Sequence, residues 1–224
     1  MIHMPRGKER GDKKKARAKK IEALLRKEYP SPVIALTYSD PLQLLIAVIL
    51  SAQCTDVRVN TVTPFLFDKY KSADDFAKAI PAELEDEIHS TGFFRNKARN
   101  IIGCCAALVE HHNGNVPSSM EELLRLPGVG RKTANCILGG AFGISSGIVV
   151  DTHVLRLGGR LGLTENSQPE KVEADLCDLL DRKDWIHFGN AVILHGRKIC
   201  NARSPKCEAC LLSELCPSAE LPPK

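Results

Sequence analysis

Signals for the start of an α-helix recur along this chain and constrain its fold more than any other feature of the sequence. Asp40 stands directly before Pro41, and Ser72, Ser118 and Ser167 each precede an acidic residue by three positions. A side-chain oxygen at such a position caps the first helical turn, and the carboxylate can reach back to it. No segment alternates between apolar and polar residues as a strand would. The sequence therefore predicts an all-α protein, with helices near 16–29, 41–53, 56–70, 73–79, 82–90, 95–112, 119–125, 131–141, 151–158, 169–181, 185–199 and after Cys207.

The composition supports a helical protein with a sizeable core. Hydrophobic residues make up 43% of the 224 residues, whereas aromatic residues make up only 5%. The longest apolar run, LLIAVIL at 44–50, is too short to span a bilayer, and the N-terminus lacks the apolar segment of a signal peptide. We expect a soluble, monomeric, intracellular protein without a membrane partner.

The positive charge is concentrated at the N-terminus. Residues 1–20 hold nine Lys and Arg and two Asp and Glu, a net charge of +7, so the remaining 204 residues sum to −3. Residues 1–15 are predicted to form a basic disordered tail, which would suit contact with an anionic partner such as nucleic acid. A merely solubilising extension is an equally open interpretation.

Four of the nine cysteines form a separate pattern near the C-terminus. Their spacing is C-x6-C-x2-C-x5-C and they are Cys200, Cys207, Cys210 and Cys216. An odd cysteine count without an export signal argues against a disulfide framework, whereas clustered thiols are typical of a zinc or iron–sulfur site. A single close CxxC pair favours an iron–sulfur cluster over structural zinc. Arg203 and Lys206 lie inside this loop and could contact phosphate.

The segment LPGVGRKTANCILGGAFG, residues 126–143, predicts two helices joined by a tight hairpin. It lacks the glycines of a nucleotide-binding P-loop at the required positions. Gly128 and Gly130 permit positive φ and close backbone approach, so the N–H groups that open the second helix could bind a DNA phosphate. Lys132 lies in that first turn, where the helix dipole disfavours the protonated amine and so favours a Schiff-base nucleophile. A solvated or phosphate-binding lysine is the alternative.

Asp151, in GIVVDTHVLRL, is the second candidate for chemistry. A carboxylate near an amine would suit reaction at an electrophilic carbon. An ordinary helix N-cap is the alternative interpretation, since Asp is among the preferred capping residues.

Five motifs occur together and in a characteristic order: SAQCTDVRVN at 51–60, LPGVGRKTAN, VDTHV with its Asp nineteen residues after Lys132, LHGRKIC at 194–200, and the four-cysteine loop. On these residues the chain resembles the endonuclease III family, the bifunctional DNA glycosylases whose helix-hairpin-helix is followed by a Gly/Pro-rich loop and an aspartate. The resemblance extends from about residue 18 to 218.

This resemblance implies two helical domains with a DNA cleft between them. Residues 33–145 would form a six-helix barrel with the hairpin, and residues 16–32 plus 146–224 a discontinuous domain holding a 4Fe–4S cluster on the four cysteines. The implied partner is damaged double-stranded DNA, and the implied location is a bacterial cytoplasm, at the nucleoid.

The resemblance also implies the chemistry. Lys132 would attack C1′ of an oxidised pyrimidine nucleotide, displace the base and form a Schiff base, after which β-elimination cleaves the strand 3′ to the abasic site. Asp151 would stabilise the cationic sugar. His195 and His153 are expected to be structural.

Further residues would contact the DNA by resemblance. Gln53 and Phe93 would fill the gap left by the extruded nucleotide, although Phe93 could instead pack in the core and stands where relatives commonly have a smaller aliphatic residue. Lys97 and Arg99 would serve phosphates or the opposite strand. The hairpin residues that would meet the backbone are Gly128, Gly130 and Arg131.

Two other functions are weighed against this one. An adenine-specific mismatch glycosylase shares the fold, but that branch lacks a lysine at the position of Lys132 and carries a large extra C-terminal domain. A non-catalytic helix-hairpin-helix module has no need to keep Lys132 together with Asp151. The preferred lesion stays open, because Phe93 and a loop before Asp151 that is one residue longer than usual both flank the damage pocket.

Overall fold

A computed structural model describes residues 11–220 of the chain, and within them every regular element is helical, which confirms the all-α prediction. The predicted disordered tail is too long, because α1 (Gly11–Glu28) already includes residues 11–15, while residues 1–10 lie outside the described part. Lys and Ala favour helix, and Ala18, Ile21 and Leu25 bury one face of α1. None of the helices in residues 11–220 is long and apolar enough to cross a membrane.

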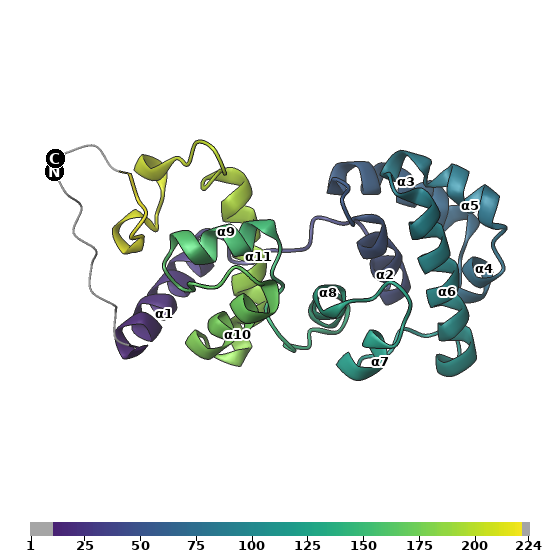
Figure 1. Cartoon of the computed structure of the whole chain (residues 1–224), viewed down its shortest axis with the longest axis horizontal. Helices are drawn as coiled ribbons and strands as arrows, with labels where there is room; N and C mark the ends of the chain where they lie inside the picture. Colours follow the sequence, from purple (N-terminus) through teal and green to yellow (C-terminus); the bar gives the residue numbers. More distant parts are fainter. Residues whose placement is uncertain (1–10, 221–224) are drawn as a thin grey trace. The chain divides into compact units, whose positions relative to one another are not determined.

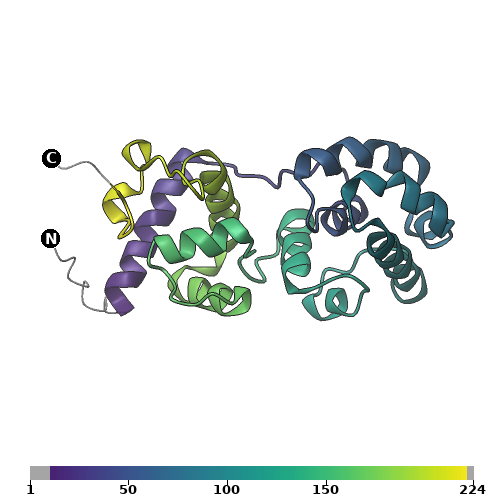
Figure 2. The same cartoon turned by 45° about the horizontal axis from the view of Figure 1, so that its top comes forward.

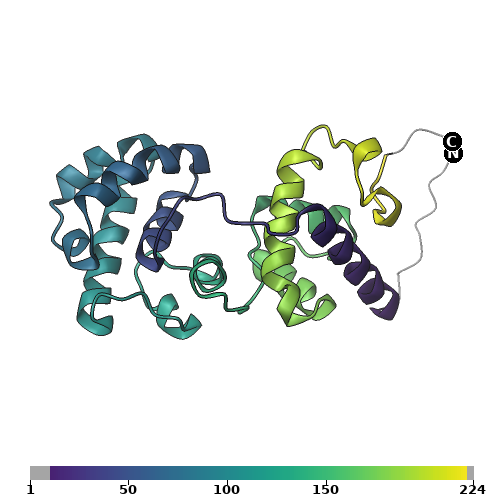
Figure 3. The same cartoon turned by 180° about the vertical axis from the view of Figure 1, so that it is seen from behind.

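The chain divides into two compact units (Figure 1). We call Val33–Ser146 the hairpin unit, and residues 11–32 with 147–220 the cysteine unit. Each unit has a hydrophobic core of its own, and no residue belongs to both cores. The cysteine unit joins both ends of the described chain, so purple α1 lies beside the later helices α10 and α11 (Figures 1 and 3).

The hairpin unit is built around the apolar helix α2, which packs against α6 and α8 (Figure 2). Six of the ten residues of α2 are buried, as expected for a helix that is hydrophobic on all sides. All residues of this unit are described, and they form seven α-helices, three of which have seven residues or fewer. These are α2 (Pro41–Leu50), α3 (Asp56–Lys69), α4 (Ala73–Ala77), α5 (Pro81–Glu87), α6 (Phe94–His112), α7 (Met120–Leu124) and α8 (Arg131–Phe142).

Two of the four predicted helix starts are confirmed and two are displaced by one residue. Asp40 caps α2 by accepting from the Gln43 N–H at 2.8 Å, and Ser72 forms a complete capping box with Asp75. In contrast, α7 follows Ser119 and not Ser118, and neither α7 nor α10 begins with a side-chain cap.

The cysteine unit consists of α1, α9 (Thr152–Arg160), α10 (Pro169–Leu179), α11 (Trp185–Lys198) and 3₁₀ turns, of which two follow α11 at Cys207–Ala209 and Ser213–Leu215. Arg17 ties α1 to the later segments, because its guanidinium donates to the carbonyls of Leu161 at 2.5 Å and Leu215 at 3.2 Å. A buried pair, His187 Nδ1 and Glu22 Oε1 at 2.8 Å, adds a second link. Together with the hydrophobic core that α1 shares with the later helices, these contacts join distant parts of the sequence in one unit.

Candidate active site and cysteine-lined cavity

The hairpin between α7 and α8 is a tight turn whose side chains Leu126 and Val129 are buried in the core of the hairpin unit. Gly128 has φ +76°, and a Cβ placed on it would lie 2.8 Å from the Cβ of Asn100, so this position requires glycine. Gly130 behaves differently: its φ is −94° and a Cβ would meet nothing within 4 Å. Gly128 therefore adopts the positive φ that glycine permits, whereas Gly130 does not.

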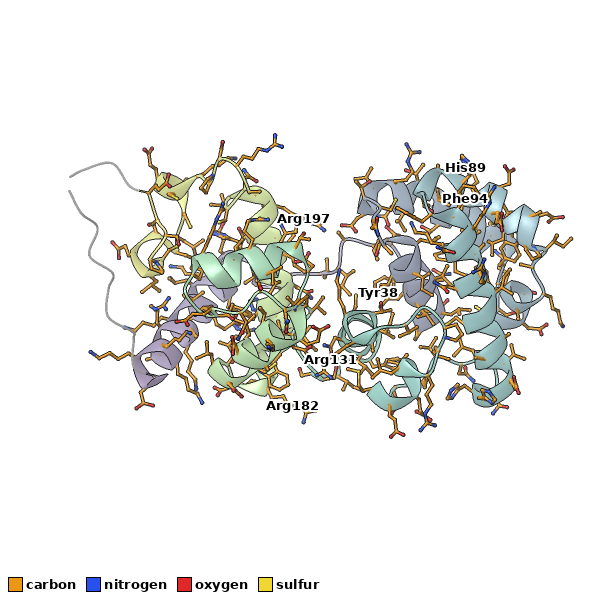
Figure 4. All side chains as sticks on the ribbon, in the orientation of Figure 1. Tyr38, His89, Phe94, Arg131, Arg182 and Arg197 are labelled. Atoms are coloured by element: carbon orange, nitrogen blue, oxygen red, sulfur yellow. The ribbon has the colours of Figure 1, made fainter. Side chains whose placement is uncertain are left out.

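The start of α8 presents charge and backbone donors together. Gly130 is the N-cap residue and supplies no side-chain cap, so the first turn is not closed by a side chain of its own. Arg131, labelled at this helix start in Figure 4, and Lys132 are both exposed. The positive end of the helix dipole adds to their charge, which makes this turn suited to an anion such as a phosphate.

Cys136 lies one helical turn after Lys132 and is a second side chain of α8 that could act as a nucleophile. Burial raises the pKa of the Cys136 thiol to about 11, although the charge of Lys132 acts in the opposite direction. A thiol with such a pKa stays protonated and unreactive at neutral pH. The amine of Lys132, in contrast, is exposed.

Asp151 is the N-cap of α9, which confirms the structural alternative as one of its roles. Its Oδ1 accepts from the N–H groups of His153 and Val154, each at 2.8 Å. Both bonds use the same oxygen, and the residue is half-buried. Asp151 belongs to the cysteine unit, whereas Lys132 belongs to the hairpin unit.

His153 lies beside this cap and is held in place. Its Nδ1 is 3.1 Å from Nη2 of Arg156, and burial lowers its pKa. A neutral, hydrogen-bonded ring agrees with the structural role expected for His153.

Gln53 and Phe93 occupy two exposed turns of the hairpin unit with an unusual backbone conformation. Their φ angles are 54° and 49°, in the left-handed region that residues with a Cβ disfavour. Phe93 is 62% exposed, which excludes the alternative that it packs in the core. The next residue, Phe94, is half-buried and packs on the ring of His89, with ring centroids 4.5 Å apart (Figure 4).

Lys97 corrects an expectation. Its side chain is 4% exposed, and Nζ donates to the carbonyls of Leu50 and Thr91, each at 2.8 Å. Burial lowers the pKa of this ammonium group. A side chain committed to two internal carbonyls does not reach a phosphate, so the predicted direct contact of Lys97 with DNA is wrong. Arg99, two residues on, is exposed.

The four late cysteines line one cavity of about 300 Å³. Within residues 11–220 no three His, Cys, Asp or Glu side chains form a group that could hold a single metal ion. A tetrahedral zinc site needs sulfur atoms about 3.8 Å apart, because each lies about 2.3 Å from the metal. Four thiols that line one cavity could hold a metal centre, and thiolate ligands suit both zinc and iron–sulfur clusters.

Two buried or half-buried groups contact these sulfur atoms. Arg160 Nη1 donates to Cys200 Sγ at 3.3 Å, and His195 Nε2 lies 3.3 Å from Cys210 Sγ. Burial lowers the pKa of His195 to about 4, so its ring is neutral and can donate one N–H. Burial raises the pKa of the Cys210 thiol. Arg203 and Lys206 line the same cavity and are exposed.

Sequence reasoning missed the residues that hold the cysteine segment against α9. Arg156 Nη2 donates to the carbonyls of Gly196 and Cys200, and Arg160 donates to those of Asn201 and Ala202. The four-residue spacing of the two arginines places them on one helix face, which is the signal that could have indicated them.

The comparisons with known proteins agree with one another. Residues 46–182 match the family described as HhH-GPD superfamily base excision DNA repair protein. Endonuclease III of Synechocystis sp. is 55% identical over 207 residues, 92% of this chain and 94% of the relative. Endonuclease III of Escherichia coli is 40% identical over 202 residues, 89% of this chain and 95% of the relative.

A solved structure extends this likeness to three dimensions. The structure of a trapped endonuclease III–DNA covalent intermediate superposes with a TM-score of 0.87 at 42% identity, covering 92% of this chain and 96% of that one. The matched family model spans more than half of the chain, and the relatives cover nearly all of it. The chain therefore belongs to the endonuclease III family of the HhH-GPD superfamily of base excision DNA repair proteins.

Proposed function

We propose that this chain is a bifunctional DNA glycosylase and AP lyase that removes oxidised pyrimidines from duplex DNA, with Lys132 as its nucleophile. Membership of the endonuclease III family supports the glycosylase and lyase activities in base excision repair. The single observation that carries the residue assignment is the exposed Lys132 in the uncapped first turn of α8, directly after the hairpin.

The reaction then proceeds in two stages. Lys132 Nζ attacks C1′, the bond between C1′ and the base breaks, and the base leaves with the electron pair. The amine loses its proton and the sugar ring opens to a Schiff base. Removal of a C2′ proton next breaks the bond from C3′ to oxygen, which cleaves the strand on the 3′ side. Water releases the sugar and restores the amine.

Asp151 stabilises the cationic sugar and assists the proton transfers. Because its hydrogen bonds to the backbone of α9 use Oδ1, the carboxylate is held in one orientation by the helix that it caps.

The remaining DNA contacts divide by role. Gln53 and Phe93, both exposed on turns, fill the space of the extruded nucleotide. Gly128, Gly130 and Arg131 meet the backbone at the hairpin. On the cysteine unit, Arg203 and Lys206 add phosphate contacts.

Cys200, Cys207, Cys210 and Cys216 hold a 4Fe–4S cluster. The single close CxxC pair and the likeness to endonuclease III support this choice over zinc, and all four thiols line one cavity of about 300 Å³. The cluster supplies structural cross-links between thiolates when it is bound. Purified protein should be brown and contain about four iron and four sulfide per chain, whereas a colourless protein with stoichiometric zinc would refute the assignment.

The two units carry different parts of this function. We assign the hairpin unit as the domain of the nucleophile and the wedge residues, and the cysteine unit as the domain of Asp151 and the cluster. A bacterial cytoplasm is the location that best suits an enzyme acting on chromosomal DNA.

Borohydride trapping tests the proposal. Reduction of the Schiff base should link the wild-type protein covalently to duplex DNA with an abasic site or an oxidised pyrimidine, and Lys132→Gln should form no such adduct. The lyase assignment fails if the wild type gives no adduct, or if Lys132→Gln gives as much as the wild type.

A further inference from the structure

The buried side chain of Lys97 joins the two turns that carry Gln53 and Phe93. We propose that Lys97 is a positioning residue for nucleotide extrusion, which holds both wedge residues in a fixed relation to each other. This inference rests on the proposed function, because it assigns Gln53 and Phe93 to the gap in the duplex. It concerns the hairpin unit alone, to which all three residues belong.

A single atom connects the two turns. Leu50 is the last residue of α2 and precedes Gln53 by three positions. Thr91 ends the 3₁₀ turn η1 (His89–Thr91) and precedes Phe93 by two positions. Nζ of Lys97 lies 2.8 Å from both carbonyl oxygens, so it holds these two backbone atoms within twice that distance of each other.

The backbone at the end of α2 leaves a place for this ammonium group. The N–H of Cys54, which would continue the helix by bonding to Leu50, instead donates to the carbonyl of Ser51 at 3.1 Å. Leu50 is thus one of the last carbonyls of α2, which need a partner from outside the helix. A cation at a helix C-terminus is also favoured by the helix dipole, which offsets part of the cost of burying Lys97.

Two hydrogen bonds from Lys97 hold the turn that carries Phe93. The side chain of Lys97 binds the carbonyl of Thr91, while its backbone N–H donates to the carbonyl of Phe93 at 3.1 Å. The left-handed conformations of Gln53 and Phe93 persist only where the surroundings enforce them. The bonds of Lys97 supply that constraint directly beside both residues.

Extrusion of a nucleotide benefits from such preorganisation. The duplex must open before any chemistry at C1′, and side chains already in place fill the gap without a further ordering cost. Lys97 therefore acts on the opening of the duplex and not on the reaction of Lys132. A single-stranded abasic substrate has no base to extrude and no opposite strand, so its cleavage should not depend on Lys97.

The experiment compares two substrates at single turnover. Lys97→Met should lower the rate on a duplex with an oxidised pyrimidine by roughly 10- to 100-fold, as a misplaced group can, and leave cleavage of a single-stranded abasic oligonucleotide within about twofold of wild type. Lys97→Gln, which keeps donors for one carbonyl, is the milder companion and should fall between. Lys78→Met is the matched control, because Lys78 is an exposed lysine of the same unit that pairs with Asp74 on the surface.

A double variant separates positioning from general stability. Phe93→Ala should lower the duplex rate by itself, and adding Lys97→Met should cost little more, because both changes remove the same wedge. Equal losses on duplex and single-stranded substrates, or fully additive losses in the double variant, would overturn the inference. A wild-type protein without any trapped adduct on abasic DNA would instead overturn the proposed function.

Discussion

Helices α6 and α8 begin in similar ways, yet the lysine in the first turn of α6 is buried and the lysine in the first turn of α8 is exposed. Each helix follows a turn with a glycine at positive φ, Gly92 or Gly128, and neither has a side-chain cap. Lys97 is the fourth residue of α6 and is buried, whereas Lys132 is the second residue of α8 and is exposed.

Helical register explains this difference. Lys97, Ile101, Cys104 and Leu108 follow one another at helical spacing on the buried face of α6. In α8 the buried face begins at Ala134, so Lys132 falls outside it. A lysine on a buried face must satisfy its charge within the protein, and it becomes a structural group. A lysine outside that face remains available for chemistry.

Replacing Lys132 should have the largest effect. Lys132→Gln removes the amine and should lower single-turnover strand cleavage of an abasic duplex by about a thousand-fold or more. The midpoint of thermal unfolding should not change, because the side chain is exposed. Lys78→Gln serves as the control and should retain full activity. Cleavage at the wild-type rate by Lys132→Gln would show that another residue is the nucleophile. The exposure of Lys132 would then not explain the activity.

Helix α9 differs from α6 and α8 because a side chain, that of Asp151, caps its first turn. A substitution of Asp151 can therefore separate its capping role from its catalytic role. Asn is as good an N-cap as Asp, so Asp151→Asn should keep the stability within about 0.5 kcal/mol. It should lower the reaction rate about 100-fold, since the negative charge is lost. Rates are measured at single turnover and stability by urea unfolding. Full activity of Asp151→Asn would leave Asp151 as an N-cap only.

The two hairpin glycines should differ in their effect on folding. Gly128→Ala should destabilise the protein by about 1–3 kcal/mol, because it combines positive φ with a clash against Asn100. Gly130→Ala should cost less than about 1 kcal/mol, from the weaker N-cap preference of Ala alone. Urea denaturation followed by circular dichroism compares the two. An equal or reversed order would contradict the geometry of the turn.

A phosphate-binding cation should show the smallest effect. Arg203→Ala should weaken DNA binding only a few-fold and reduce the slope of log affinity against log salt by about one. Lys171→Ala, an exposed lysine on α10, is the control and should leave both quantities unchanged. A large loss of cleavage rate at saturating DNA would show that Arg203 does more than contact phosphate.

Helix starts could be predicted from the sequence where they depend only on residues close together in the chain. The caps at Asp40 and Ser72 were predicted correctly because each cap involves only four consecutive positions. The start of α1 was placed too late, since its first turns are stabilised by docking of Arg17 onto distant carbonyls.

Contacts between residues of separate elements could not be predicted from local sequence patterns. The contact of His195 with Cys210 joins residues from separate elements. Lys97 is an intermediate case: its spacing to Ile101 and Leu108 indicates the buried face of α6, but its closeness in sequence to Phe93 suggested a DNA contact instead. Periodicity over the whole helix was the better guide.

Mapping the covalent adduct tests the central contrast most directly. After borohydride trapping on abasic duplex DNA, proteolysis and mass spectrometry identify the lysine that carries the reduced sugar. We expect the modification on Lys132 alone, with Lys97 unmodified. A modification on Lys97, or on any lysine other than Lys132, would contradict the assignment of the exposed lysine of α8 as the nucleophile.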